Sequence, residues 1–108
     1  MNIKQAINVA AAAQAAPETT RIDANQTMMD IGHGNVAAIS GGRFLGGDHA
    51  VVMPVSNGYH VVVSLSHDNT YTVRRVFVRG GKATVKGEWS EIYYHQLGEI
   101  AYQASCFN

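Results

Sequence analysis

Residues 50–65 read AVVMPVSNGYHVVVSL and carry the strongest structural signal in the chain. The pair Asn57-Gly58 is the preferred sequence of a two-residue type I′ turn, because both central residues of that turn need a positive φ. An apolar run lies on each side of the pair, as expected for a β-hairpin. A two-residue loop would place Val52 opposite Val63 and so set the register of the whole hairpin.

In this register the hairpin has two faces of different composition. The first face is continuously apolar and is expected to form the core: Ala50, Val52, Pro54, Val61, Val63 and Leu65. The second face is mixed, yet too apolar to be fully wet, so a terminal helix or another protein chain should cover it in part. Its apolar members are therefore predicted to bind a partner protein or a second copy of the chain: Val51, Met53, Val55 and Val62.

Residues 71–89 read YTVRRVFVRGGKATVKGEW and predict a second hairpin around Gly80-Gly81. A two-residue loop would place Arg79 opposite Lys82 and Arg75 opposite Lys86. The turn at residues 67–69 joins the two hairpins, so residues 49–89 are expected to form a four-stranded antiparallel meander. The short apolar run at residues 36–39 indicates a further strand near 35–45.

Helical patterns lie at both ends of the chain. Residues 3–15 are rich in alanine and have isoleucines one turn apart, so they predict a helix that stops before Pro17, and residues 17–34 look like a polar connection. Residues 90–105 predict a second helix capped by Ser90, with Gly98 at a close approach to a strand. The prediction is a single α+β domain over residues 1–108: an antiparallel meander of four to five strands with an N-terminal and a C-terminal helix.

The charge balance limits the classes of partner. Eight basic residues match eight acidic ones among 108 residues, so the chain has no overall field that would steer it to nucleic acid or an anionic membrane. No apolar run reaches the length of a transmembrane helix. Cys106 is the only cysteine, which excludes an intramolecular disulfide and fits a reducing cytosol. We expect this thiol to be buried as a small apolar group.

A local basic stretch is the exception to this balance, since residues 74–86 hold five of the eight basic residues and no acidic one. In the expected register, like charges oppose one another across the second hairpin with an aromatic ring between them, an arrangement that is destabilising unless it binds an anion. One reading is a nucleic-acid-binding face, in which cations contact phosphates and the ring stacks on bases. The other is a solvated sheet edge protected against edge pairing. The residues concerned are Arg75, Phe77, Arg79, Lys82 and Lys86.

The histidines offer a weaker chemical signal. The expected register brings Asp48 opposite His67, with His49 adjacent in sequence, at the open end of the first hairpin. This arrangement reads first as a cross-strand hydrogen bond and second as the centre of a small metal-dependent or hydrolytic protein. The spacing of a zinc motif, a phosphate-binding loop or a nucleophile elbow is missing from the sequence. No cofactor and no catalytic residue is predicted.

The closing segment, from Tyr71 through Gly80-Gly81-Lys82 to Leu97-Gly98-Glu99 and Cys106, resembles small uncharacterised proteins encoded by tailed bacteriophages. This resemblance covers the last third of the chain and implies expression in a bacterial cytoplasm. It assigns no functional residue. The preferred prediction is a non-enzymatic accessory protein that binds a host or phage protein, or itself, and modulates a host function. Nucleic-acid binding on the basic face is the alternative.

Overall fold

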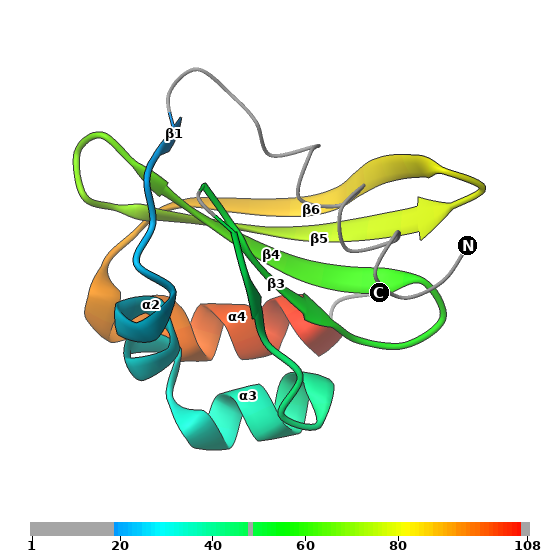
Figure 1. The fold of residues 1–108 in the computed structure, drawn as a ribbon, viewed down its shortest axis with the longest axis horizontal. Helices are drawn as coiled ribbons and strands as arrows, with labels where there is room; N and C mark the ends of the chain where they lie inside the picture. Colours follow the sequence, from blue (N-terminus) through cyan, green and yellow to red (C-terminus); the bar gives the residue numbers. More distant parts are fainter. Residues whose placement is uncertain (1–18, 48, 107–108) are drawn as a thin grey trace.

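The computed structural model describes residues 19–47 and 49–106, and in these ranges three α-helices pack on one face of an antiparallel sheet (Figure 1). The helices are α2 (Ala24–Ile31), α3 (His33–Ser40) and α4 (Leu97–Cys106), and a short 3₁₀ helix, η1 (Tyr94–Gln96), precedes α4. The helix expected at residues 3–15 lies outside the described residues.

The sheet has six strands in the described part of the chain, all paired antiparallel. They are β1 (Thr19–Thr20), β2 (Leu45–Gly46), β3 (Val51–Pro54), β4 (Tyr59–Ser66), β5 (Tyr71–Arg79) and β6 (Lys82–Ile92). Strands β2 to β6 lie side by side in sequence order. Strand β1 pairs with the last residues of β4, beyond the first residue of β3. This arrangement confirms the predicted α+β class and the predicted meander.

Helices α2 and α3 occupy a region where the sequence indicated a polar connection and a strand, so those two expectations are wrong. Asp23 caps α2, because its carboxylate accepts a 3.1 Å hydrogen bond from the backbone N–H of Gln26. The apolar run at residues 36–39 misled because Val36 and Ile39 also fall on one side of a helix, where both are buried. A short apolar run has no periodicity that separates strand from helix.

The C-terminal helix is shorter than expected. Strand β6 continues to Ile92, so Ser90 lies in the sheet and is not a helix cap. The predicted close approach at Gly98 is confirmed, but its partner is a helix and not a strand. A methyl group at this position would come within 2.4 Å of the carbonyl oxygen of Ile31. Because Gly98 has no side chain, α4 can pack directly against the end of α2.

The first hairpin has the predicted turn but not the predicted register. Asn57 and Gly58 have φ values of 57° and 86°, and the N–H of Tyr59 donates to the oxygen of Ser56 at 3.0 Å, as in a type I′ turn. The next cross-strand bond, however, is made by Val55, whose N–H donates to the oxygen of Tyr59 at 2.9 Å. Ser56 is therefore an extra residue on the first strand, and the register shifts by one.

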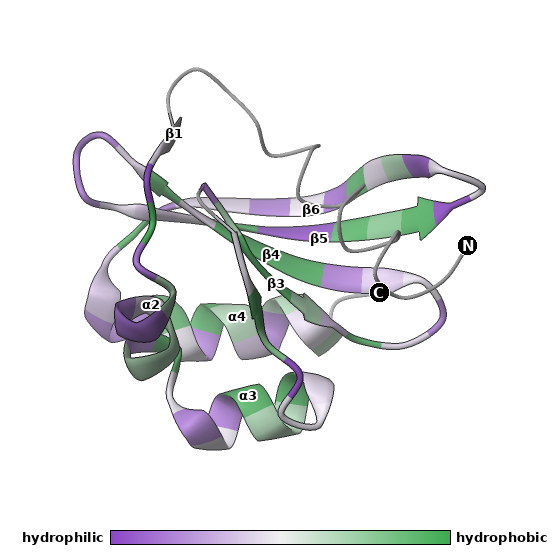
Figure 2. Cartoon of the chain, viewed as in Figure 1, coloured by the Kyte–Doolittle hydropathy of each residue, from purple (hydrophilic) through white to green (hydrophobic). Residues whose placement is uncertain are grey.

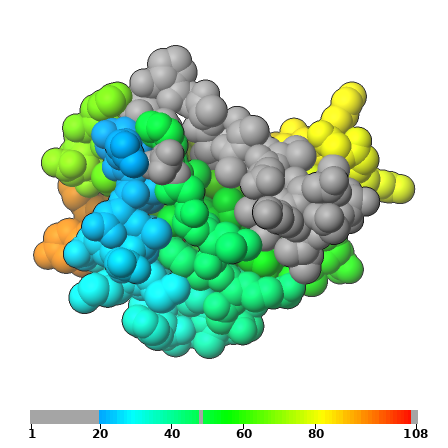
Figure 3. All heavy atoms as spheres, in the orientation of Figure 1, coloured from blue at the N-terminus to red at the C-terminus, as the bar shows by residue number. Residues whose placement is uncertain are grey.

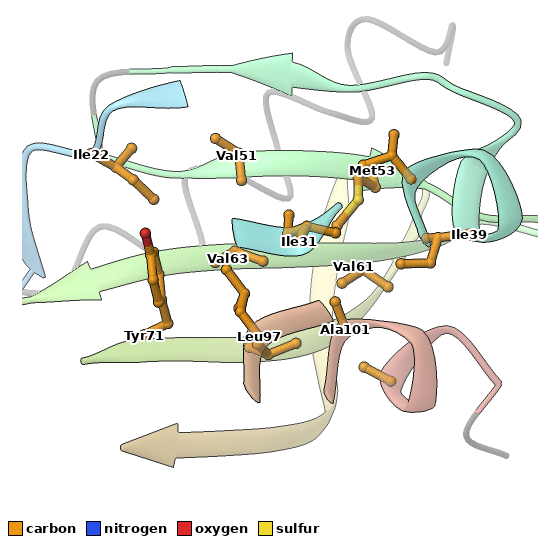
Figure 4. Close-up of a cluster of buried hydrophobic side chains, with 13 residues drawn as sticks. Ile22, Ile31, Ile39, Val51, Met53, Val61, Val63, Tyr71, Leu97 and Ala101 are labelled. Carbon is orange, nitrogen blue, oxygen red and sulfur yellow. The ribbon is translucent and has the colours of Figure 1, made fainter. Parts of the chain in front are cut away.

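This shift reverses the faces of β3 relative to β4, since successive strand residues point to opposite sides. Val51 lies opposite Val63, and Met53 lies opposite Val61. These four side chains form the core beneath the helices together with Leu97 and others, as Figure 4 shows. The core face predicted for β3 is therefore wrong, whereas Val61 and Val63 of β4 are core residues as expected.

The opposite face of the sheet is also buried. Its cluster contains Ala50, Val52, Val62, Val76 and Val78, with Ala83 packed against it. In Figure 2, much of β3 and the middle of β4 are hydrophobic at the centre of the sheet. Apolar residues therefore fill both faces, and the predicted contrast between a buried face and a half-exposed one does not hold.

Candidate interaction surface

Exposed aromatic side chains gather where β6 passes into α4. The side chains of Tyr93 and Tyr94 are 56% and 67% exposed, and Tyr102, further along α4, is 44% exposed. His95 is also exposed. We call Tyr93, Tyr94 and His95 the aromatic strip. Large rings with this much exposed surface bind partners well, because tyrosine offers a large contact area and has few rotatable bonds to immobilise.

Backbone and ring contacts hold the beginning of the strip in place. The N–H of Gln96 donates to the oxygen of Tyr93 at 2.9 Å, and the Gln96 side chain accepts a 3.2 Å hydrogen bond from the N–H of Tyr93. The His95 ring stacks beside Tyr93 at a centroid distance of 6.1 Å and meets Tyr94 edge-on at 5.4 Å. The strip is therefore ordered before any partner arrives.

A β-bulge directs the chain into the strip. Tyr71 pairs with Ile92 and Val73 pairs with Trp89, so two residues of β6, Ser90 and Glu91, lie opposite one residue of β5. Glu91 has a φ of 56°, which is uncommon for a residue with a side chain. Such backbone strain is concentrated at functional positions, where the surrounding structure maintains it.

The basic face forms only in part. Arg79 lies opposite Lys82 as predicted, and both are exposed. Arg75, however, lies opposite Gly87, because Lys86 is the extra residue of a second bulge. The predicted pairing of Arg75 with Lys86 is therefore wrong.

Arg75 is occupied inside the protein. Its side chain is buried, and one guanidinium nitrogen donates 2.8 Å hydrogen bonds to the carbonyl oxygens of Ala104 and Ser105 at the end of α4. The guanidinium carbon lies 4.1 Å from the centroid of the Tyr59 ring. Phe77 is half-buried and packs against the same ring at 4.9 Å. Arg75 thus satisfies the last carbonyls of α4 and is not available to a phosphate.

The residues predicted to bind a protein are buried. Val51 and Met53 have no exposed surface and lie under the helices, and Val55 packs at the edge of the same core. Val62 is equally buried on the other face of the sheet. The extra residue Ser56 explains this outcome, because it places Val51 and Met53 on the core side. These four residues do not form one exposed surface.

Asp48, which was predicted to face His67, lies outside the described residues. His49 and His67 are both exposed. The described residues hold no cluster of three or more histidine, cysteine, aspartate or glutamate side chains suited to a metal ion. Cys106 is exposed, contrary to expectation.

The turn that carries His67 is stabilised locally. The Asp68 carboxylate accepts a 2.6 Å hydrogen bond from the Thr70 hydroxyl and a 3.1 Å bond from its N–H. The hydrogen bond from the hydroxyl has the larger effect, and the two bonds together hold the pKa of Asp68 below its ordinary value. This is the geometry of an Asx turn, so Asp68 has a structural task.

Sequence reasoning missed the aromatic strip. Tyr93 falls inside the helix that was predicted over residues 90–105, because Tyr93, Leu97 and Ala101 follow one another at helical spacing. The run Tyr93-Tyr94-His95 was the available signal, since three consecutive rings cannot all face a core. The true helix starts only at Leu97.

Comparisons with protein-family models, curated proteins and solved structures found no match to this chain. Among the described helices, none is long and apolar enough to cross a membrane.

Proposed function

We propose that the chain is a small, non-enzymatic accessory protein that binds another protein through the aromatic strip. The observation that carries this proposal is the exposure of Tyr93 and Tyr94 side by side on one short segment, which hydrogen bonds with Gln96 and ring contacts with His95 hold in place. Tyrosine is enriched among the residues that contribute most to binding energy at protein interfaces. The resemblance of the last third to phage proteins makes a bacterial host protein in the cytoplasm the proposed partner.

The strip replaces the surface expected around Met53, which lies in the core. The strip also suits a small accessory protein, because its residues lie close together in the sequence and can be presented to a partner as one surface. The internal hydrogen bonds of Tyr93 with Gln96 reduce the entropy lost on binding.

The test is affinity capture from a bacterial lysate with matched variants. The double variant Tyr93→Ser/Tyr94→Ser removes the strip, and Leu45→Ser/Val85→Ser removes two other exposed apolar side chains of 48% and 45% exposure. We expect a protein that is captured by the parent and by the control variant but not by the strip variant. Equal capture by all three proteins, or capture by none, would contradict the proposal.

A second candidate function is polyanion binding at the tip of the second hairpin. The observation that favours it is the direct pairing of Arg79 with Lys82, with Phe77 two residues before Arg79 in β5. In Figure 3 this tip projects from the body of the protein. A gel-shift titration with single-stranded DNA tests it: Arg79→Ser and Lys82→Ser should each reduce the salt slope by about one. No binding by the parent at low salt would exclude this function.

A further inference from the structure

We infer that the aromatic strip receives arginine side chains from a basic segment of the partner protein. This inference rests on the proposed function and adds the chemistry of the partner. It follows from the charges around the strip, from the way the protein itself binds an arginine, and from the distance between the strip and the exposed cations of the second hairpin.

The segment that contains the strip is acidic. Residues 87–106 include three glutamates and neither lysine nor arginine. Glu88 is engaged by Arg74 at 2.7 Å, whereas Glu91 and Glu99 are exposed. Glu99 lies three residues before Tyr102 on α4, so it shares a helix face with that ring. Glu99 accepts a weak 3.4 Å hydrogen bond from the side-chain amide of Gln103. The segment that carries the rings therefore also presents the exposed carboxylates of Glu91 and Glu99.

The helix that packs beside η1 does not neutralise this charge. Residues 22–42, which include all of α2 and α3, contain two aspartates and no lysine or arginine. Met29 of α2 is 67% exposed and adds apolar surface on that helix. Of the cations on the neighbouring β5, Arg74 pairs with Glu88 and Arg75 is bound to the end of α4. The exposed carboxylates of Glu91 and Glu99 can therefore still attract a cationic partner.

Arginine fits this surface better than lysine. The guanidinium group is planar and weakly hydrated, so it can stack on a tyrosine ring and still donate hydrogen bonds to a carboxylate or carbonyl oxygen. The protein already contains such a site, in which Arg75 stacks on Tyr59 while it donates to two carbonyl oxygens. The strip offers the same combination of ring and acceptor on the outside.

The exposed cations Arg79 and Lys82 cannot fill the strip within one molecule. Tyr71 pairs with Ile92 beside the strip, and Arg79 lies eight residues further along β5. At about 3.3 Å per residue this separation is roughly 26 Å. Figure 1 shows the strip region and the hairpin tip at opposite ends of the sheet.

The test is fluorescence anisotropy with a labelled peptide in which arginine alternates with glycine, at low salt. We expect the parent to bind it more tightly than the matching lysine peptide. Tyr94→Ser and Glu99→Gln should each weaken binding about two- to fivefold, as expected for an exposed cation–π contact. Tyr94→Phe and Val85→Ser should leave binding unchanged.

Two results would overturn the inference. One is arginine-peptide binding that is insensitive to both Tyr94→Ser and Glu99→Gln. The other is concentration-dependent self-association in sedimentation that Arg79→Ser abolishes, because the occupant would then be a second copy of the chain. If lysate capture depends on Tyr93 and Tyr94 while the peptide does not bind, the proposed function stands and this inference fails.

Discussion

The hydroxyl of Tyr71 donates a 2.8 Å hydrogen bond to the carboxylate of Asp30, and this bond ties the start of β5 to α2. Tyr71 is buried, so the bond lies at the boundary between the helices and the sheet. Burial first, and the neighbouring carboxylate second, raise the pKa of Tyr71 to about 12. The same contact fixes α2 beside the aromatic strip, because Tyr71 pairs with Ile92 at the end of β6.

Replacing Tyr71 by phenylalanine should lower the free energy of unfolding by about 1–2 kcal/mol, because a hydrogen bond to a charged acceptor is lost while the ring is retained. Urea denaturation measures this loss. A raised folded pKa means that the contribution is present below pH 10 and is lost as the pH rises towards the folded value. Absorbance titration should show one tyrosine ionising near pH 12, and Tyr71→Phe should remove that step. If this titration step persists in Tyr71→Phe, another tyrosine produces it.

Replacing Gly98 by alanine should destabilise the protein by about 1–3 kcal/mol, since the added methyl group would lie 2.4 Å from the Ile31 oxygen and would push α4 away from α2. Gly34→Ala is the matched control. Gly34 lies in α3, and a methyl group there meets nothing within 4 Å. That change should stabilise the protein by up to about 1 kcal/mol through helix propensity. Thermal melts of the two variants should therefore shift in opposite directions.

Replacing either Val62 or Val63 by aspartate should unfold the protein, because both side chains are fully buried on opposite faces of the sheet. An unpaired charge at such a site costs more than about 4 kcal/mol. Val85→Asp, on the exposed edge strand, should cost about 1 kcal/mol or less. Circular dichroism measures whether each of the three variants is folded. A folded Val62→Asp variant would show that the second face is not a core.

Replacing Arg75 by methionine should destabilise the protein by about 2–4 kcal/mol, because the carbonyl oxygens of Ala104 and Ser105 lose their buried donor. Arg75→Lys should recover only part of this, since an ammonium group cannot stack on Tyr59 in the same way. Hydrogen exchange of α4 amides reports the effect directly. If the α4 amides of Arg75→Met are as protected from hydrogen exchange as those of the parent, Arg75 does not stabilise α4.

Acidification from about pH 7.5 to about pH 5.5 should lower the melting temperature through His60. This side chain is buried, and burial lowers its pKa below 6.5, although backbone oxygens of Gly58 and Val76 partly oppose the shift. A depressed histidine pKa means that the unfolded chain binds more protons in this range, so stability is present above pH 6.5 and declines below it. His60→Gln should show a smaller pH dependence than the parent. An equal dependence in both proteins would assign it to other groups.

Several features of the fold could be predicted from residues that act through their own backbone. Asn57 and Gly58 have the positive φ values that the predicted turn requires, and Gly80-Gly81 closes the second hairpin with Arg79 opposite Lys82. Gly98 predicted a close approach, because a glycine inside a helix lowers the stability of the helix and is expected only where a side chain would not fit. These signals predicted the meander and the presence of a C-terminal helix, although that helix begins at Leu97 and not at residue 90.

Tertiary structure alone decided which face of each strand is buried and where the candidate site lies. One extra residue is inserted at each of three bulges: Ser56, Lys86, and one of the pair Ser90 and Glu91. Each insertion reverses the direction of the side chains beyond it. These bulges have no sequence signature, and their positions depend on which side chains the helices can cover. The same packing placed Val51 and Met53 in the core, turned Arg75 inward to cap α4, and left Tyr93 and Tyr94 exposed, because burial is a property of the assembled layers and not of any single segment.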